Sequence, residues 1–265
     1  MNKLLPAHRD INDSEPETAP LASPLRFSET RAYLIGVADY TAPHWKLKTP
    51  VNDVHAIGAF LSNHCNFHTE IIENPGKKKI EALLSHIAAE GCGEDTPVLI
   101  YFAGHGTADE SREGIKGYLI PADAEPGNRD TYIDMADVAA ALASMPCRHL
   151  LLVLDCCFGG SFRWAEKTNN LTLGVNDHAF RLTKSHYDYF TQKRAIQVLT
   201  SCAPNQKALD FIRIGDHEGT NSPFATLFLS GLVHADVNQD KIITVAELYN
   251  YLQDTLSKGA FHKNA

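Results

Sequence analysis

The sequence has little of what marks several large classes of protein. No run of basic residues exceeds the three lysines at 77–79, and the net charge is −8 with an isoelectric point near 5.9. Neutralising phosphates needs a basic face, so we expect no nucleic-acid partner. No stretch of about 18 apolar residues occurs, and the N-terminal segment has no apolar signal core, so we expect neither a membrane span nor a secretory signal.

Cysteine is present without a pairing pattern. The six cysteines form no CxxC pair and no dense framework, which argues against a disulfide scaffold and against a structural zinc site. We therefore expect a cytoplasmic chain with mostly reduced thiols. What remains is an ordinary globular composition, 44% hydrophobic and 21% charged over 265 residues. One large α/β domain or two smaller ones can bury a core at this length.

The chain alternates apolar strands with amphipathic helices after an N-terminal leader. Residues 1–28 are rich in Pro, Ser, Glu and Asp and lack periodicity, which predicts disorder. Apolar runs predict strands in residues 31–40, 68–72, 96–106, 148–157 and 194–202. Helical periodicity predicts helices in residues 50–65, 77–91, 135–145, 222–233 and 245–256. The alternation predicts parallel strands with right-handed crossovers, and fully apolar strands are typical of a sheet covered on both faces.

Two of the predicted strands end in reactive residues beside glycines. His105 ends one strand within "GHG", and Cys156 and Cys157 end another within "DCCFGG". In parallel sheets, sites form at the carboxyl ends of the strands. A nucleophilic cysteine needs a base or a lowered pKa, and an imidazole is a suitable base. Taken singly, a loop histidine and a cysteine that fills the core are the commoner alternatives. The conjunction of both at strand ends favours a Cys-His pair.

The segments "YFAGHG" (101–106) and "DCCFGG" (155–160) resemble the histidine and cysteine signatures of the caspase-like cysteine peptidases of clan CD, family C14. Their order, their spacing of about 50 residues, the "NDV" stretch at 52–54 and the "SPFATLFLSGL" helix are most similar to metacaspases and bacterial, orthocaspase-type proteins. The resemblance covers roughly residues 31–256. It implies a three-layer α/β/α sandwich whose mostly parallel central sheet has about six strands flanked by helices.

The resemblance also implies a division of the chain. The peptidase domain would span residues 29–258, followed by a tail at 259–265. Within the domain, the expected parts are a large-subunit-like part, a linker and a small-subunit-like part, at residues 29–160, 161–193 and 194–258.

The family pattern implies a role for each reactive residue. It assigns the nucleophile to Cys157 and the base to His105. If the two strands are neighbours, the backbone N–H groups of Gly106 and Cys157 are expected to form the oxyanion hole. Cys156 stands where serine is usual and is expected to be a spectator. Family members usually lack a third triad residue, and we name none. A catalytically silent scaffold is the alternative function. A thiol redox role is disfavoured because adjacent cysteines form strained disulfides.

Two acids are candidates for substrate selection. Asp53 falls in the first turn of a predicted helix, where the helix dipole favours an acid, and Asp155 is a candidate strand-end cap. Metacaspases use acids at these two positions to bind the basic side chain before the cut. The resemblance thus implies protein or peptide substrates cleaved after Arg, then Lys, and not after Asp. Pro50 and Ala103 replace the family's common Cys and Ser and affect the pocket wall.

The predicted linker carries several sites that a basic-specific peptidase can cut. They are Arg163, Lys167, Arg181, Lys184 and Lys193. Activation of a zymogen by self-cleavage or by an upstream protease is one interpretation, and a solvated surface loop is the other. By resemblance, we expect a monomer that acts in bacterial stress, cell death or antiviral defence.

A possible ion site lies near the C-terminus. The ligand order of an EF-hand is present in Asp236, Asn238, Asp240 and Glu247, but Lys241 replaces the glycine of that loop. A structural acidic loop is the alternative. The sequence therefore requires no cofactor, and Ca²⁺ is the candidate ion.

Overall fold

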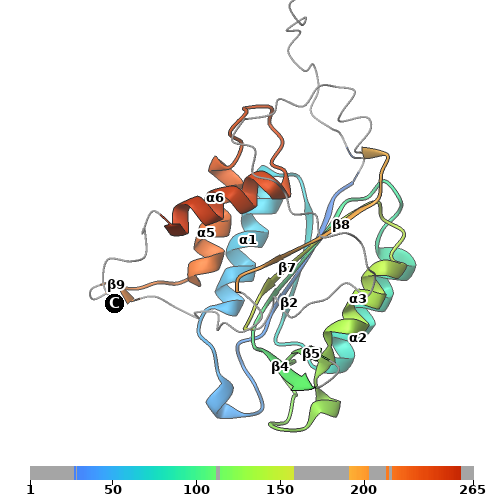
Figure 1. The fold of residues 1–265 in the computed structure, drawn as a ribbon, viewed down its shortest axis with the longest axis vertical. Helices are drawn as coiled ribbons and strands as arrows, with labels where there is room; N and C mark the ends of the chain where they lie inside the picture. Colours follow the sequence, from blue (N-terminus) through green and yellow to red (C-terminus); the bar gives the residue numbers. More distant parts are fainter. Residues whose placement is uncertain are drawn as a thin grey trace, which may run out of the picture.

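The computed structural model describes residues 27, 29–111, 114–157, 191–202, 213–214 and 217–257. The expected leader (except Phe27), the tail, and the linker before residue 191 lie outside these residues. A parallel sheet forms the centre of the fold (Figure 1), with strand order β2-β1-β3-β7-β8. Its strands are β1 (Arg31–Gly36), β2 (His68–Glu73), β3 (Val98–Ala103), β7 (His149–Asp155) and β8 (Ala195–Thr200).

Helices cover both faces of this sheet, so the predicted three-layer sandwich is confirmed. One face carries α1 (Pro50–His64), α5 (Pro223–His234) and α6 (Val245–Ser257), and the other carries α2 (Lys77–His86) and α3 (Met135–Ser144), as Figure 1 shows. Each face has its own hydrophobic core. In the described ranges the sheet has five strands, where about six were expected. No helix in the described part of the chain is long and apolar enough to cross a membrane.

The pleat of β7 decides where its last residues point. Leu152 and Leu154 belong to the core beneath α2 and α3, whereas Val153 belongs to the core beneath α1 and α5. Because successive side chains alternate between the two faces, Asp155 continues the series of Val153. Cys156 returns to the opposite core, where it is buried. The same alternation thus separates the carboxylate from the adjacent thiol.

A small antiparallel sheet lies beyond the end of β3 and was not predicted. It has the order β4-β5-β6, with β4 (Gly106–Ser111), β5 (Gly114–Leu119) and β6 (Ile133–Asp134). The segment of β4 is mostly polar, so its strand conformation comes from pairing with β5 rather than from an apolar pattern. A second antiparallel pair joins β9 (Arg213–Ile214) to β10 (His217–Glu218).

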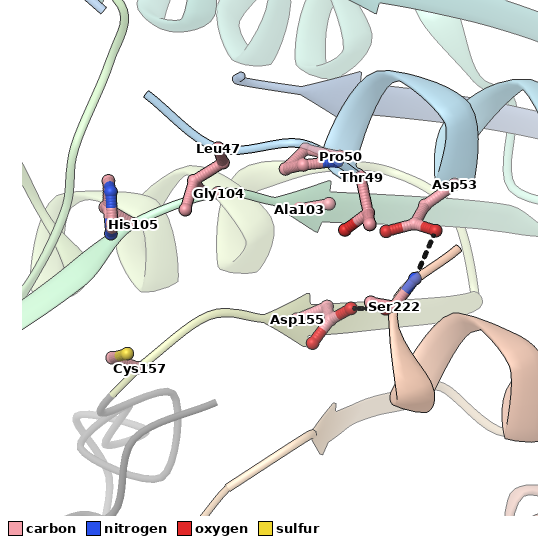
Figure 2. Close-up of a pocket in the computed structure, with 10 residues that line it drawn as sticks. All are labelled: Leu47, Thr49, Pro50, Asp53, Ala103, Gly104, His105, Asp155, Cys157 and Ser222. Carbon is pink, nitrogen blue, oxygen red and sulfur yellow. Dashed lines mark hydrogen bonds between the residues drawn. The ribbon is translucent and has the colours of Figure 1, made fainter. Parts of the chain in front are cut away.

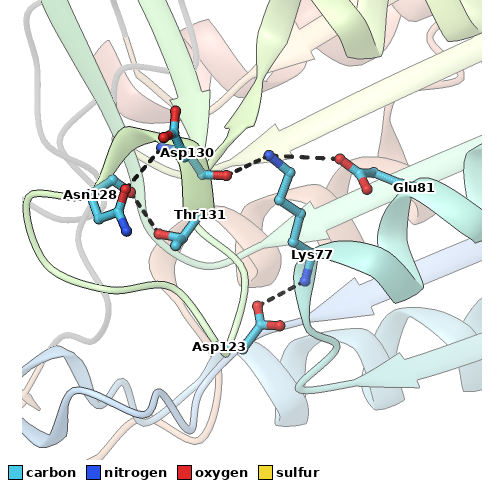
Figure 3. Close-up of polar contacts among 6 residues, drawn as sticks. All are labelled: Lys77, Glu81, Asp123, Asn128, Asp130 and Thr131. Atoms are coloured by element: carbon cyan, nitrogen blue, oxygen red, sulfur yellow. Dashed lines mark hydrogen bonds and ion pairs between the residues drawn. The ribbon is translucent and has the colours of Figure 1, made fainter.

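Polar contacts tie the connection between β5 and β6 to helix α2 (Figure 3). The backbone N–H of Lys77 donates to Asp123 Oδ1 at 2.8 Å, and Lys77 Nζ donates to the carbonyl oxygen of Asp130 at 2.8 Å. Asp123 thereby caps the N-terminus of α2 from outside the helix. This connection in turn accepts from Thr41, whose N–H donates to the carbonyl oxygen of Ala122 at 2.9 Å.

Candidate functional site

The ends of β3 and β7 bring the predicted catalytic residues into one pocket. Ala103 lies opposite Asp155 in the strand register, and the N–H of Gly104 donates to the carbonyl oxygen of Asp155 at 3.2 Å. The segments that follow β3 and β7 therefore leave the sheet side by side. His105 and Cys157 follow at these ends and both line a pocket of about 60 Å³ (Figure 2).

Two neighbours of His105 define its position. Its backbone N–H donates to the hydroxyl of Tyr40 at 2.8 Å, and its Nε2 lies 2.8 Å from the carbonyl oxygen of Trp45. A carbonyl oxygen only accepts, so Nε2 carries the hydrogen and Nδ1 holds the lone pair of the neutral ring. The carbonyl of Trp45 thus orients the imidazole. The sequence predicts no third catalytic residue, and its signal for this contact is limited to the aromatic residues Tyr40 and Trp45 after β1.

The glycines beside His105 serve close approach rather than unusual backbone angles. Neither has a positive φ angle. A Cβ atom on Gly104 would lie 3.0 Å from the hydroxyl oxygen of Tyr40. A Cβ atom on Gly106 would collide with the carbonyl oxygen of Cys157. Neighbouring chain segments therefore block a side chain at position 106 and crowd one at position 104.

The two adjacent cysteines have different surroundings. Cys157 is half-buried at the pocket, whereas Cys156 is 1% exposed and belongs to the α2–α3 core. Burial first, and then the charge of Asp155, raise the pKa of the Cys156 thiol well above its usual range. Cys156 therefore has the environment of an inert core thiol. Its carbonyl oxygen accepts a hydrogen bond from the thiol of Cys202 at 3.0 Å.

One serine links the two predicted specificity acids (Figure 2). The backbone N–H of Ser222 donates to Asp53 Oδ1 at 2.9 Å, and its hydroxyl donates to Asp155 Oδ2 at 2.7 Å. The side-chain amide of Asn221 also donates to Asp53 at 2.9 Å, and the hydroxyl of Tyr101 donates to Asp155 at 3.3 Å. Residues from three distant parts of the chain thus assemble one acidic pocket.

The carboxylates of this pocket are buried, and no Lys or Arg in the described part of the chain pairs with them. Asp53 is 1% and Asp155 is 7% exposed, and neither Lys nor Arg is among the described residues that line the pocket. Burial raises the pKa of Asp53, against the hydrogen bonds from Asn221 and Ser222. Burial also raises the pKa of Asp155 to about 6, and the Ser222 hydroxyl opposes the rise. Asp53 Oδ2 has no hydrogen-bond partner among the described residues. The pocket is therefore complementary to a cation.

The simpler explanations for these acids do not match their contacts. Asp53 receives its hydrogen bonds from the segment before α5, so it does more than complement the dipole of α1. Asp155 accepts from hydroxyl groups rather than capping a backbone N–H. The sequence did not identify Ser222 as a pocket residue, because a serine before a helix indicates only an N-cap. Ser222 does cap α5, since its hydroxyl oxygen accepts from the N–H of Ala225 at 3.0 Å. Pro50 lines the pocket, as expected.

The acidic loop at residues 236–247 is closed by its own backbone. The N–H of Lys241 donates to Asp236 at 2.9 Å, and Glu247 exchanges hydrogen bonds with Thr244 as a capping box of α6. In the residues described, no group of three or more His, Cys, Asp or Glu side chains is placed to hold a metal ion. Calcium binding there stays a prediction.

The fold and this pocket define the class of the protein. Its class is that of the caspase-like α/β proteins, with a histidine and a cysteine at the carboxyl ends of neighbouring parallel strands. The family model of the caspase domain matches residues 29–264, so the chain belongs to the caspase domain family, which is a family of cysteine peptidases that act on proteins.

Solved structures show the same fold. A protein of Geobacter sulfurreducens is similar with a TM-score of 0.53 and 15% identity, covering 84% of this chain and 88% of that one. Caspase-1 of Spodoptera frugiperda is similar with a TM-score of 0.50 and 15% identity, covering 95% of this chain and 82% of that one. No curated protein matches the chain in sequence.

Proposed function

We propose that this chain is a cysteine endopeptidase that cleaves proteins after Arg, and second after Lys, with Cys157 as nucleophile and His105 as base. The observation that carries the specificity is the acidic pocket of Asp53 and Asp155, which adjoins both catalytic candidates. The observation that supports the catalytic pair is their place at the ends of the paired strands β3 and β7.

The proposed reaction is acyl transfer. His105 Nδ1 accepts the proton of the Cys157 thiol, and the thiolate attacks the scissile carbonyl carbon to form a tetrahedral oxyanion. The backbone N–H groups of Gly106 and Cys157 stabilise that oxyanion. Collapse breaks the C–N bond, and the proton passes from His105 to the leaving amine. Water, deprotonated by His105, then attacks the thioester and releases the acid and the free thiol. The Trp45 carbonyl supports the positive imidazolium, since it accepts from Nε2.

The preference for Arg over Lys follows from the arrangement of acceptors. Two carboxylates on separate elements, α1 and β7, offer acceptors from two directions. The forked, planar guanidinium can donate to both at once, whereas an ammonium is a compact point charge. An Asp side chain would meet two like charges in a buried pocket and is rejected.

A catalytically silent scaffold remains the second candidate. His105, Cys157 and Asp155 are all retained, and a scaffold has no need for an acidic pocket that adjoins a half-buried thiol.

Fluorogenic peptides that differ only in the residue before the cut test the proposal. We expect kcat/KM for the Arg peptide to exceed that for the Asp peptide by on the order of 100-fold or more, because an unpaired buried charge costs several kcal/mol. The Lys peptide should lie between them. Faster cleavage of the Asp peptide would contradict the proposed specificity, and no cleavage of any peptide by folded protein would favour the scaffold.

Processing of the linker is a second expected result. We propose that the peptidase cuts its own basic linker at 161–193. Incubation followed by intact-mass measurement should show fragments ending at Arg or Lys for the wild type and an intact chain for Cys157→Ala. Equal fragments from both proteins would instead assign the cut to another protease.

We further propose that the protein acts as a cytoplasmic monomer in bacterial stress, cell death or antiviral defence. This setting rests on the family resemblance, which also underlies the proposed activation by processing.

A further inference from the structure

We propose that the hydroxyl group of Tyr40 is a positioning group that fixes His105 relative to Cys157. The inference rests on the proposed function, in which His105 is the base, but it concerns a residue outside the catalytic pair and the acidic pocket. Tyr40 belongs to the loop of residues 38–47, which follows β1 and reaches over the end of β3.

This loop holds His105 at two points. The Tyr40 hydroxyl oxygen accepts from the backbone N–H of His105 at 2.8 Å, and the Trp45 carbonyl oxygen accepts from its Nε2 at 2.8 Å. The first bond fixes the main chain where it leaves the sheet, and the second fixes the far side of the ring. Together they fix both the backbone that carries the imidazole and the orientation of the ring.

Aromatic packing makes the position of Tyr40 well defined. Tyr40 is 8% exposed, and the centre of its ring lies 5.0 Å from that of His105 and 6.1 Å from that of Trp45, which it meets edge-on. The ring of Trp45 in turn lies 6.2 Å from that of Tyr132 in the adjoining small-sheet region. Offset and edge-on aromatic contacts of this kind have a preferred geometry. The packing of the ring therefore holds the Tyr40 hydroxyl beside the backbone N–H of His105.

The loop that carries Tyr40 is itself closed and anchored. The N–H of Leu47 donates to the carbonyl oxygen of Ala38 at 2.9 Å, which closes the loop at its base. The N–H of Thr41, directly after Tyr40, donates to the carbonyl oxygen of Ala122 at 2.9 Å, within the connection that is tied to α2. Displacement of His105 would therefore require this whole assembly to shift.

The absence of a side chain on Gly104 belongs to the same arrangement. A Cβ atom there would lie 3.0 Å from the Tyr40 hydroxyl oxygen and 3.2 Å from Val37 Cβ. Because Gly104 has no side chain, the phenol ring of Tyr40 can occupy this space. Phenylalanine at position 40 would keep the ring contacts but leave the N–H of His105 without the acceptor that places it.

The test compares two Tyr→Phe variants. Tyr40→Phe removes the hydroxyl at the site. Tyr33→Phe is the control and removes another buried hydroxyl, that of Tyr33 in β1, which donates to the carbonyl oxygen of Gly91 at 3.2 Å. With an Arg peptide, we expect Tyr40→Phe to lower kcat about 10-fold while KM changes less than about 2-fold, as one lost hydrogen bond to the base predicts. Tyr33→Phe should leave both constants within about 2-fold, at a similar loss of thermal stability.

A second readout needs no substrate. Alkylation of Cys157 by iodoacetamide, followed by mass spectrometry of its peptide, should slow several-fold in Tyr40→Phe and stay unchanged in Tyr33→Phe, with His105→Ala setting the lower limit. Unchanged kcat and unchanged alkylation in folded Tyr40→Phe would overturn the inference. So would equal losses in both variants, because these would indicate a general packing effect.

The outcomes separate this inference from the proposed function. If the wild type cleaves no Arg peptide but Tyr40→Phe still slows alkylation, the specificity is wrong and the positioning role stands. If Tyr40→Phe does not fold, Trp45→Leu provides the second variant, since it keeps the backbone carbonyl but removes the aromatic contacts to Tyr40 and His105. A kcat loss with unchanged KM in that variant supports the inference, and unchanged kcat overturns it.

Discussion

Replacing Cys157 by Ala is expected to abolish peptide cleavage, with a loss of kcat of at least about 1000-fold, because no other thiol can form the acyl enzyme. Replacing Cys156 by Ser is expected to keep kcat within about 5-fold, since this thiol is buried in the α2–α3 core and its high pKa keeps it protonated. Steady-state kinetics with an Arg peptide measure both effects.

Thermal unfolding of both variants is the control for this pair. Cys156→Ser places a hydroxyl in an apolar core and is expected to lose about 1–2 kcal/mol of unfolding free energy. Cys157→Ala, at a half-buried position, should lose less. If Cys156→Ser were inactive although folded, and Cys157→Ala active, the assignment of the nucleophile would be reversed.

Replacing Asp155 by Asn is expected to weaken cleavage and strengthen the fold at the same time. Without one of the two carboxylates, kcat/KM for an Arg peptide should fall on the order of 100-fold. Cleavage of a matched peptide with neutral citrulline should change much less. The unfolding free energy at pH 7 should rise by roughly 2–3 kcal/mol, because the folded protein holds this carboxyl with its pKa raised from 3.8 to about 6 by burial.

The sign of the pH dependence follows from that direction. The folded state binds the proton of Asp155 more tightly than the unfolded state does. This proton binding therefore contributes to the unfolding free energy of the wild type in full below pH 3.8, and the contribution is lost as the pH rises through about 6. The stability difference between Asp155→Asn and wild type should therefore shrink toward pH 4. The activity moves the other way: kcat/KM of the wild type for Arg peptides should fall below about pH 6, as the pocket loses a charge.

Asp137→Asn, an exposed acid on α3, is the matched control for the chemical change and should alter neither quantity by much. A loss of stability in Asp155→Asn with unchanged selectivity between Arg and citrulline peptides would show that Asp155 has a purely structural role. Such a result would leave the catalytic pair untouched, because it is tested by the cysteine variants.

The sequence by itself determined the layers of the fold and the chemistry at two strand ends. Apolar runs bury both faces of a parallel sheet, and helical periodicity gives the covering helices, because these patterns depend on local spacing. His105 and Cys157 were identified from glycine-flanked strand ends and a family resemblance, and the pairing of β3 with β7 places them at one pocket.

Only the tertiary structure decided how the pocket is completed. Ser222 joins Asp53 to Asp155 across 169 and 67 residues of sequence, and the aromatic loop of Tyr40 reaches His105 across 65 residues. The strand β4 likewise exists through pairing with β5. Contacts of this kind depend on which surfaces meet after the sheet has formed, and local sequence patterns therefore do not predict them. The spacing of apolar residues specifies a buried strand, but not which hydroxyl lies beside its last carboxylate.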